Sequence, residues 1–153
     1  MANYDCDVAL VGAALDVVAA ENTSGAGAIV QFFGDVRPLE NGEHIDGIEY
    51  EAHQEMAEHQ LRKIADEAAE RFGLLAVRLH HRVGFVAVGE TSLFLTVAAA
   101  HRGAAFDASR WIVDELKKRV PIWKSIVVKS DKARERAVLV CIGRIVSRSA
   151  ALF

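Results

Sequence analysis

Two long stretches with apolar residues at helical spacing, each followed by a residue that ends helices, constrain the fold of this chain most. In residues 52–72 the apolar side chains recur every three or four positions up to Gly73, and glycine readily adopts the left-handed conformation found at helix ends. Residues 104–118 repeat the spacing before Pro121, which cannot continue a helix because it lacks an amide hydrogen. The pattern predicts two amphipathic helices, the second ending near Arg119.

Short apolar runs surround these two stretches and have the length and composition of strands. They cover residues 26–33, 74–85, 91–100 and 122–128. Asn41-Gly42 is a strong turn dipeptide and predicts a hairpin across residues 26–51. Strands that alternate with two helices indicate an α+β sandwich, in which two main helices pack on a mainly antiparallel sheet. A length of 153 residues fits one domain over residues 1–153.

Composition and charge exclude several classes of protein. The chain is 52% hydrophobic and 25% charged, as globular proteins are, and its net charge of -3 gives no electrostatic reason to expect nucleic acid or a membrane surface as partner. The apolar run 91–100 is shorter than the roughly 20 residues that cross a bilayer. The chain starts with acids where a secretory signal carries Lys or Arg. Cys6 and Cys141 form no CxxC pair, so we expect reduced thiols and a cytoplasmic location.

Basic residues at the ends of predicted elements are the first candidates for chemistry, because scaffolds present functional side chains there. Arg37 follows the first strand, where a solvated turn arginine is the common alternative. His101 and Arg102 lie between an apolar strand and the second helix. The amides of a helix N-terminus favour anions, so this pair suits a phosphate, although it can equally cap the edge of the core.

A third basic group contains four cations within eight residues: Lys117, Lys118, Arg119 and Lys124. Neighbouring positive charges disfavour protonation, so one lysine here is a candidate nucleophile or base with a lowered pKa. On a helix, an acid four positions earlier holds a lysine as an ordinary surface pair. Asp114 stands there for Lys118 and Glu115 for Arg119, whereas Val113 stands there for Lys117.

Lys124 lies beyond the proline on a predicted strand, where we expect Trp123 to take the buried face. Lys117 and Lys124 are therefore the two candidate catalytic lysines. The other histidines lack the spacing of a zinc site, and His80, His81 and Arg82 alternate along one strand, so no metal is predicted. The sequence contains no P-loop, nucleophile elbow or dinucleotide fingerprint, and no cofactor is predicted.

Several motifs resemble the large, catalytic subunit of molybdopterin synthase. They are Phe33-Gly34-Asp35-Val36-Arg37, Glu49-Tyr50-Glu51-Ala52 with Met56-Ala57, His81-Arg82-Val83-Gly84 with Gly89-Glu90, and His101-Arg102 through Ala105-Phe106, Asp114 and Lys117 to Pro121-Ile122-Trp123-Lys124. The resemblance is strongest over residues 26–124. Residues 125–153 diverge, because Ser125-Ile126 replace a charged pair containing Glu and no Trp follows Trp123.

The resemblance implies an α/β hammerhead-type fold, a homodimer, and a heterotetramer with a small ubiquitin-like sulfur-carrier subunit. The implied reaction is sulfur transfer from the carrier's C-terminal thiocarboxylate to cyclic pyranopterin monophosphate, which forms the dithiolene of molybdopterin. By motif position, Lys117 and Lys124 are catalytic, while Arg37, His101 and Arg102 bind substrate. The family's basic residue that reaches the neighbouring subunit is not identifiable in residues 125–153.

Two other functions fit some of these features. A non-catalytic anion-binding or regulatory α/β domain for a phosphorylated metabolite would use Arg37, His101 and Arg102. It would leave the two candidate lysines without a role. A sulfur carrier based on Cys6 or Cys141 would need one of these thiols for activity.

Overall fold

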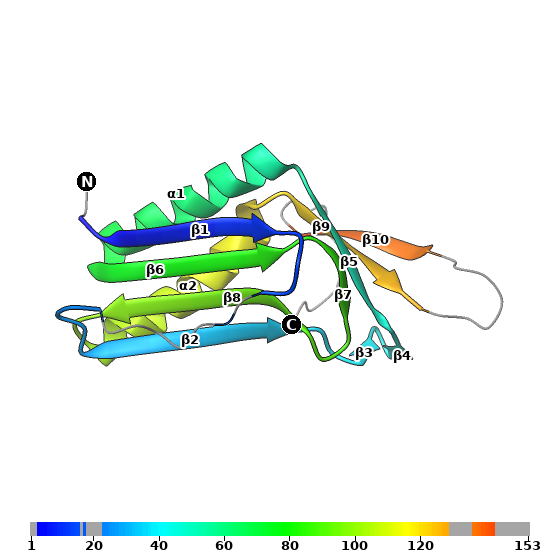
Figure 1. Cartoon of the computed structure of the whole chain (residues 1–153), viewed down its shortest axis with the longest axis horizontal. Helices are drawn as coiled ribbons and strands as arrows, with labels where there is room; N and C mark the ends of the chain where they lie inside the picture. Colours follow the sequence, from blue (N-terminus) through cyan, green and yellow to red (C-terminus); the bar gives the residue numbers. More distant parts are fainter. Residues whose placement is uncertain (1–2, 16, 18–22, 129–135, 143–153) are drawn as a thin grey trace.

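The first of two four-stranded sheets forms the long side of the molecule in the computed structural model, which describes residues 3–15, 17, 23–128 and 136–142 (Figure 1). Its strands, in spatial order, are β1 (Asp5–Val11), β6 (Leu74–Arg82), β8 (Thr91–Ala99) and β2 (Ala28–Asp35). β8 is antiparallel to both of its neighbours, β6 and β2, and β1 runs parallel to β6.

The second sheet extends from one end of the first and is antiparallel throughout (Figure 1). Its order is β10 (Arg136–Ile142), β9 (Ile122–Val127), β5 (Gly47–Ala52) and β7 (Gly84–Ala87). A small hairpin, β3 (Leu39–Glu40) with β4 (Glu43–His44), closes around Asn41 and Gly42. Both turn residues have positive φ angles, 52° and 84°, as a two-residue hairpin turn of this handedness requires.

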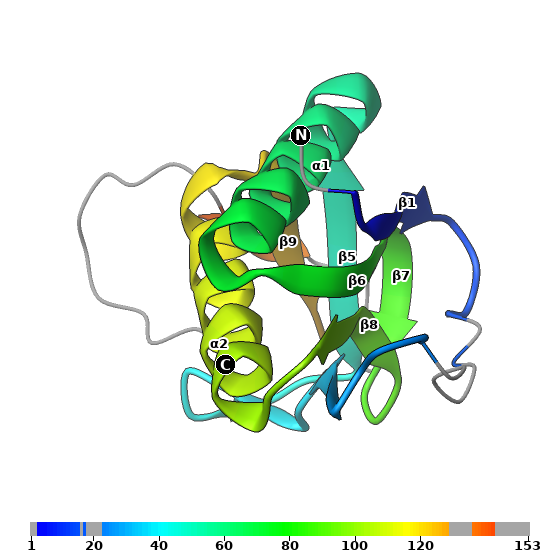
Figure 2. The ribbon, with the colours of Figure 1, turned by 90° about the vertical axis from the view of Figure 1, so that its left-hand side faces the viewer.

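Two helices, α1 (Gln54–Phe72) and α2 (Arg102–Arg119), cover one face of the first sheet (Figure 2). Gly73 caps the end of α1 in the left-handed conformation, with a φ of 64°. α2 ends at Arg119, and its C-cap residue Val120 directly precedes Pro121. Both helix ends agree with the sequence prediction. Among the described residues, neither helix is long and apolar enough to span a membrane.

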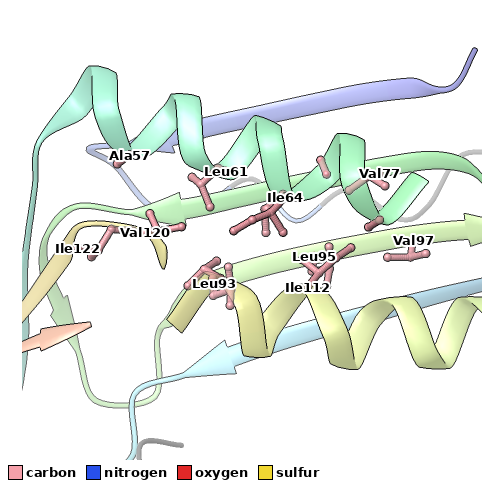
Figure 3. Close-up of a cluster of buried hydrophobic side chains, with 14 of the residues drawn as sticks. Ala57, Leu61, Ile64, Val77, Leu93, Leu95, Val97, Ile112, Val120 and Ile122 are labelled. Atoms are coloured by element: carbon pink, nitrogen blue, oxygen red, sulfur yellow. The ribbon is translucent and has the colours of Figure 1, made fainter. Parts of the chain in front are cut away.

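The core lies between the helices and the first sheet (Figure 3). Leu61 and Ile64 of α1 and Ile112 of α2 are fully buried against Leu79 and Leu95 of the sheet. At about 25 cal/mol per Å² of apolar surface, each such side chain contributes roughly 1.5 to 3 kcal/mol. This packing holds the C-terminal end of α2 beside the second sheet, where the candidate lysines lie.

The predicted fold class is confirmed, but two details of the prediction are wrong. Residues 26–51 do not form one hairpin: β2 pairs with β8, and β5 pairs with β7 and β9. The strand predicted over residues 74–85 is interrupted at Val83 and divides between the two sheets. β1 was not predicted. The backbone of residues 136–142 forms β10, and the rest of the apolar stretch 137–146 lies outside the described residues.

Candidate functional site

A buried ion pair joins the end of β3 to the middle of β9. The Lys124 ammonium donates to Oε1 of Glu40 at 2.6 Å, and the two side chains are only 4% and 7% exposed. The Glu40 carboxylate also faces Arg37, whose Nη2 lies 3.4 Å from Oε2. One carboxylate thus connects two of the predicted site residues.

The burial of Lys124 corrects the sequence prediction for this strand. Trp123 is half-buried and Lys124 is buried, the reverse of what was expected. A lysine is rarely buried unless its charge is paired, and Glu40 provides that pair. Burial of Lys124 therefore depends on a partner 84 residues away in the sequence.

Lys117 lies in the last turn of α2 and belongs to the same group of cations. Burial is the largest cause that lowers the pKa of the Lys117 ammonium below its ordinary value. Asp114 partly offsets this effect on the pKa, while the nearby charges of Lys124 and Arg37 lower the pKa further. A lysine with a lowered pKa was predicted here from four neighbouring cations, and Lys124 is one of the charges that lower the pKa of Lys117. Burial, the largest cause, and Arg37 were not part of that prediction.

The other two cations of the α2 segment take part in surface pairs. Lys118 is exposed and donates to Glu115 at 3.1 Å, so the expected pairing with Asp114 is wrong. Arg119 forms two hydrogen bonds, of 2.6 and 2.9 Å, with the Glu67 carboxylate of α1. Arg119 also lies 3.5 Å from Glu115, as predicted from the four-residue spacing. The two Arg119–Glu67 hydrogen bonds join the two helices, whereas both contacts with Glu115 lie within α2.

A hollow of about 330 Å³ lies between β2 and α2. Its lining is Val30, Gln31, Phe32, Ser109, Arg110, Val113 and Asp114. Val113 precedes Lys117 by one helical turn, so the hollow lies next to that lysine on the same helix face. A second hollow, lined by Asp5, Asp7 and Arg78 among others, lies on the first sheet away from these lysines.

His101 and Arg102 lie at the opposite end of α2 from Lys117. His101 is the N-cap residue but makes no side-chain capping hydrogen bond, and both side chains are exposed. Fifteen residues of helix at 1.5 Å per residue place Arg102 about 22 Å from Lys117 along the axis. Within one chain, the structure brings together Arg37, Lys117 and Lys124 but not His101 and Arg102.

Glu40 is the residue of this site that sequence reasoning missed. A usable signal was present, since Glu40 stands three residues after Arg37 and directly before the Asn41-Gly42 turn. Burial is the largest cause that raises the pKa of Tyr50, and the Glu40 charge raises this pKa further. Tyr50 pairs with Lys124 in the register of β5 and β9. Within the described ranges, no three His, Cys, Asp or Glu side chains are grouped so that they could hold a metal ion.

Comparison with known proteins identifies the family. A sequence model of the MoaE protein family matches residues 8–119, which is most of the chain. The chain belongs to the MoaE protein family. Its match begins inside β1, the strand that was not predicted, and ends at Arg119, before Lys124.

Individual members of the MoaE protein family are similar along most of their length. The molybdopterin synthase catalytic subunit of Thermoplasma volcanium is 40% identical over 116 residues, covering 76% of this chain and 85% of that protein. The corresponding protein of Pyrococcus abyssi is 42% identical over 109 residues, covering 71% and 74%. The crystal structure of molybdopterin synthase from Staphylococcus aureus superposes with a TM-score of 0.73 at 26% identity, covering 85% of this chain and 96% of that one.

Proposed function

We propose that this chain is the catalytic subunit of a molybdopterin synthase. It transfers sulfur from the C-terminal thiocarboxylate of a small ubiquitin-like carrier to cyclic pyranopterin monophosphate and forms the dithiolene of molybdopterin in the cytoplasm. The observation that carries the proposal is the convergence of Arg37, Lys117 and Lys124 from three separate segments of a MoaE family chain.

The charges of this site suit the proposed substrates. A pterin phosphate and a carrier tail that ends in a thiocarboxylate are both anionic, and Arg37 can hold an oxyanion through two parallel hydrogen bonds. Lys124 is a fixed, buried ammonium and is suited to stabilise negative charge as it develops during sulfur transfer. The hollow next to Lys117 offers an apolar wall from Val30, Phe32 and Val113 beside the charged group.

Lys117 is suited to proton transfer. Burial and the neighbouring cations lower its pKa, so near neutral pH a larger share of this lysine is free amine than of an ordinary exposed lysine. A free amine accepts a proton or attacks an acyl carbon, and its conjugate acid returns the proton. We assign proton transfer to Lys117 and charge stabilisation to Lys124.

We infer that the working enzyme is a homodimer, and with the carrier a heterotetramer. The exposed His101 and Arg102 are far from Lys117 within one chain, and a second copy placed with two-fold symmetry can bring them to the site. They would then hold the phosphate at the N-terminus of α2, where the helix dipole favours anions.

The decisive experiment incubates the purified chain with a thiocarboxylated cognate carrier and cyclic pyranopterin monophosphate, and measures molybdopterin. Product that depends on all three components supports the proposal. Binding of the pterin phosphate without any product, with a carrier verified on another molybdopterin synthase, would instead indicate a non-catalytic anion-binding domain.

A further inference from the structure

The carboxylate of Glu40 lies between two of the cations that are proposed to act on the substrate. Its Oε1 accepts from Lys124 at 2.6 Å, and its Oε2 lies 3.4 Å from Arg37. Among the acidic side chains of the described residues, Glu40 is the buried one. A buried carboxylate and a buried ammonium persist when each supplies the other's charge. This ion pair is therefore part of how the site is built.

The backbone of the β3–β4 hairpin fixes the position of Glu40. Glu40 is the last residue of β3, and the two-residue turn after it places Glu43 directly across the hairpin. The neighbouring Leu39 is exposed, as the alternation of side chains along a strand requires. Glu43 is also exposed, so one hairpin carries one buried and one exposed glutamate.

The balance of charge around Glu40 changes when an anion enters. Lys124 and Arg37 both act on the pKa of Lys117, so three positive charges lie close enough to repel one another. The Glu40 carboxylate offsets part of that repulsion through its ion pairs with Arg37 and Lys124. A phosphate or a thiocarboxylate would interact with the same cations, so Glu40 and the substrate are competing anions.

We propose that Glu40 is a positioning residue of this site, an inference that rests on the proposed function. It holds the Lys124 ammonium in place for charge stabilisation and acts as an internal counter-anion with which the anionic substrate competes. Glu40 thus improves turnover and weakens substrate binding at the same time. Such opposite effects distinguish positioning from a contribution to folding alone.

The test compares four proteins: wild type, Glu40→Gln, Glu40→Asp and the matched control Glu43→Gln. Glutamine keeps the size of the side chain but removes its charge. We expect Glu40→Gln to lower kcat by about tenfold or more, as loss of a supporting partner commonly does, and to lower KM for cyclic pyranopterin monophosphate severalfold. Glu43→Gln should match the wild type in both constants. A residue that only maintains folding would lower kcat and leave KM unchanged.

A second measurement does not depend on catalysis. Acetic anhydride acetylates neutral amines, and mass spectrometry of peptides gives the rate at Lys124 in the protein without substrate. A buried ammonium that loses its counter-charge is disfavoured, so acetylation of Lys124 should be faster in Glu40→Gln than in the wild type or in Glu43→Gln.

The outcomes separate this inference from the proposed function. An active wild type with unchanged kcat and KM in Glu40→Gln overturns the role of Glu40. A wild type without synthase activity overturns the proposed function. The acetylation rates then decide whether Glu40 holds Lys124, because equal rates at Lys124 in the wild type and in Glu40→Gln overturn that role of Glu40. If Glu40→Gln does not fold, Glu40→Asp decides, since it keeps the charge on a shorter side chain. Because a folding defect lowers kcat only through the folded fraction, kcat is calculated per folded molecule, with that fraction measured by circular dichroism. A lowered kcat per folded molecule supports the inference, and a value equal to that of the wild type contradicts it.

Discussion

Lys117 and Lys118 are adjacent in the sequence and have different surroundings. Consecutive helix residues point about 100° apart, so one can enter a site while the other remains in solvent. Lys117 is partly buried near Lys124 and Arg37, whereas Lys118 is exposed and pairs with Glu115. The difference in burial, rather than the residue type, makes Lys117 a candidate for chemistry.

Substitution of the lysines should reveal this difference. We expect Lys117→Ala and Lys124→Ala each to lower turnover at least about a hundredfold, the usual effect of removing an acid-base or charge-stabilising group. Lys118→Ala should keep near wild-type turnover and lose only about 0.3 to 0.5 kcal/mol of stability with its exposed pair. Single-turnover formation of molybdopterin measures the first effect, and urea denaturation measures the second. A Lys118→Ala variant as impaired as Lys117→Ala would contradict the assignment.

The spacing of residues in the sequence predicted some of these ion pairs, because their partners are close to each other along one helix. The rule that looks for an acid four positions earlier selected Lys117 and correctly paired Arg119 with Glu115. It paired Lys118 with the wrong acid, because a partner three positions away is equally accessible on a helix. The rule could not find Glu40 as the partner of Lys124, since residues distant in the sequence meet only through the tertiary fold.

At the level of elements, the end of β6 is where the two sheets meet. Gly84, with a φ of 86°, follows this strand and begins β7 in the second sheet. His81 is buried there, with its ring edge-on to Tyr50 of β5 at 5.1 Å between centroids. Its Nδ1 lies 2.8 Å from the carbonyl oxygen of Arg82, which can only accept, so this nitrogen carries the proton. Burial is the main cause that lowers the pKa of His81 to about 4.

The buried histidine predicts how stability depends on pH. Between its ordinary pKa of 6.5 and the lowered value of about 4, His81 is protonated in the unfolded chain but not in the folded one. The free energy of unfolding is therefore highest, as far as His81 is concerned, above pH 6.5. It falls by up to about 3 kcal/mol as the pH drops toward 4. Chemical denaturation at several pH values in this range gives the free energy of unfolding as a function of pH. This free energy should fall less steeply with decreasing pH in His81→Leu than in the wild type. His44→Gln, a substitution at an exposed histidine, should keep the pH dependence of the wild type. An equal pH dependence of the unfolding free energy in all three proteins would refute its assignment to His81.

The elements themselves were more predictable than their pairing. Helix limits follow from apolar spacing and from Gly73 and Pro121, which act on neighbouring residues. Strand partners depend on contacts between distant segments, and so the Asn41-Gly42 turn was assigned to a hairpin much larger than β3–β4. β1 also carries a local signal, since Cys6, Val8 and Leu10 pack on the core and acids alternate with them at positions 5 and 7.

At the scale of the whole molecule, the candidate site is positively charged although the net charge of the chain is negative. The chain carries a net charge of -3, yet Arg37, Lys117 and Lys124 are grouped at one place. Under the proposed function, we expect an anionic carrier tail to be attracted to this group although the protein as a whole is slightly acidic. Local clustering, not net charge, is therefore expected to govern association with the carrier.

Carrier binding should weaken as salt rises. Attraction between exposed charges is screened over about 8 Å at physiological ionic strength, so added sodium chloride reduces the affinity. Titration calorimetry at low and high salt measures the change. The affinity of Arg37→Ala for the carrier should depend less on salt than that of the wild type. Lys118→Ala should behave as the wild type, because the charge of Lys118 is already paired on the surface. An affinity independent of salt would exclude electrostatic capture of the tail.

The length of α2 leads to a prediction about subunit cooperation. Arg102 and Lys117 are about 22 Å apart along the helix, so a single chain does not place both on one phosphate ester. If a second copy supplies Arg102, the two residues of one working site belong to different chains. Lys117→Ala and Arg102→Ala should then each be severely impaired as pure dimers.

Mixed dimers of these two variants should recover activity. When the subunits are exchanged at equal ratio, half of the dimers contain one copy of each variant. Each mixed dimer has one site with both residues intact and one site that lacks both. Recovery should therefore approach about a quarter of wild-type activity for a two-fold symmetric pair. Molybdopterin formation after subunit exchange measures the recovery, and two tags purified in sequence verify the mixed species. If Arg102 instead acted on the site of its own chain, each mixed dimer would hold one Lys117→Ala site and one Arg102→Ala site, and activity would stay at the level of the separate variants.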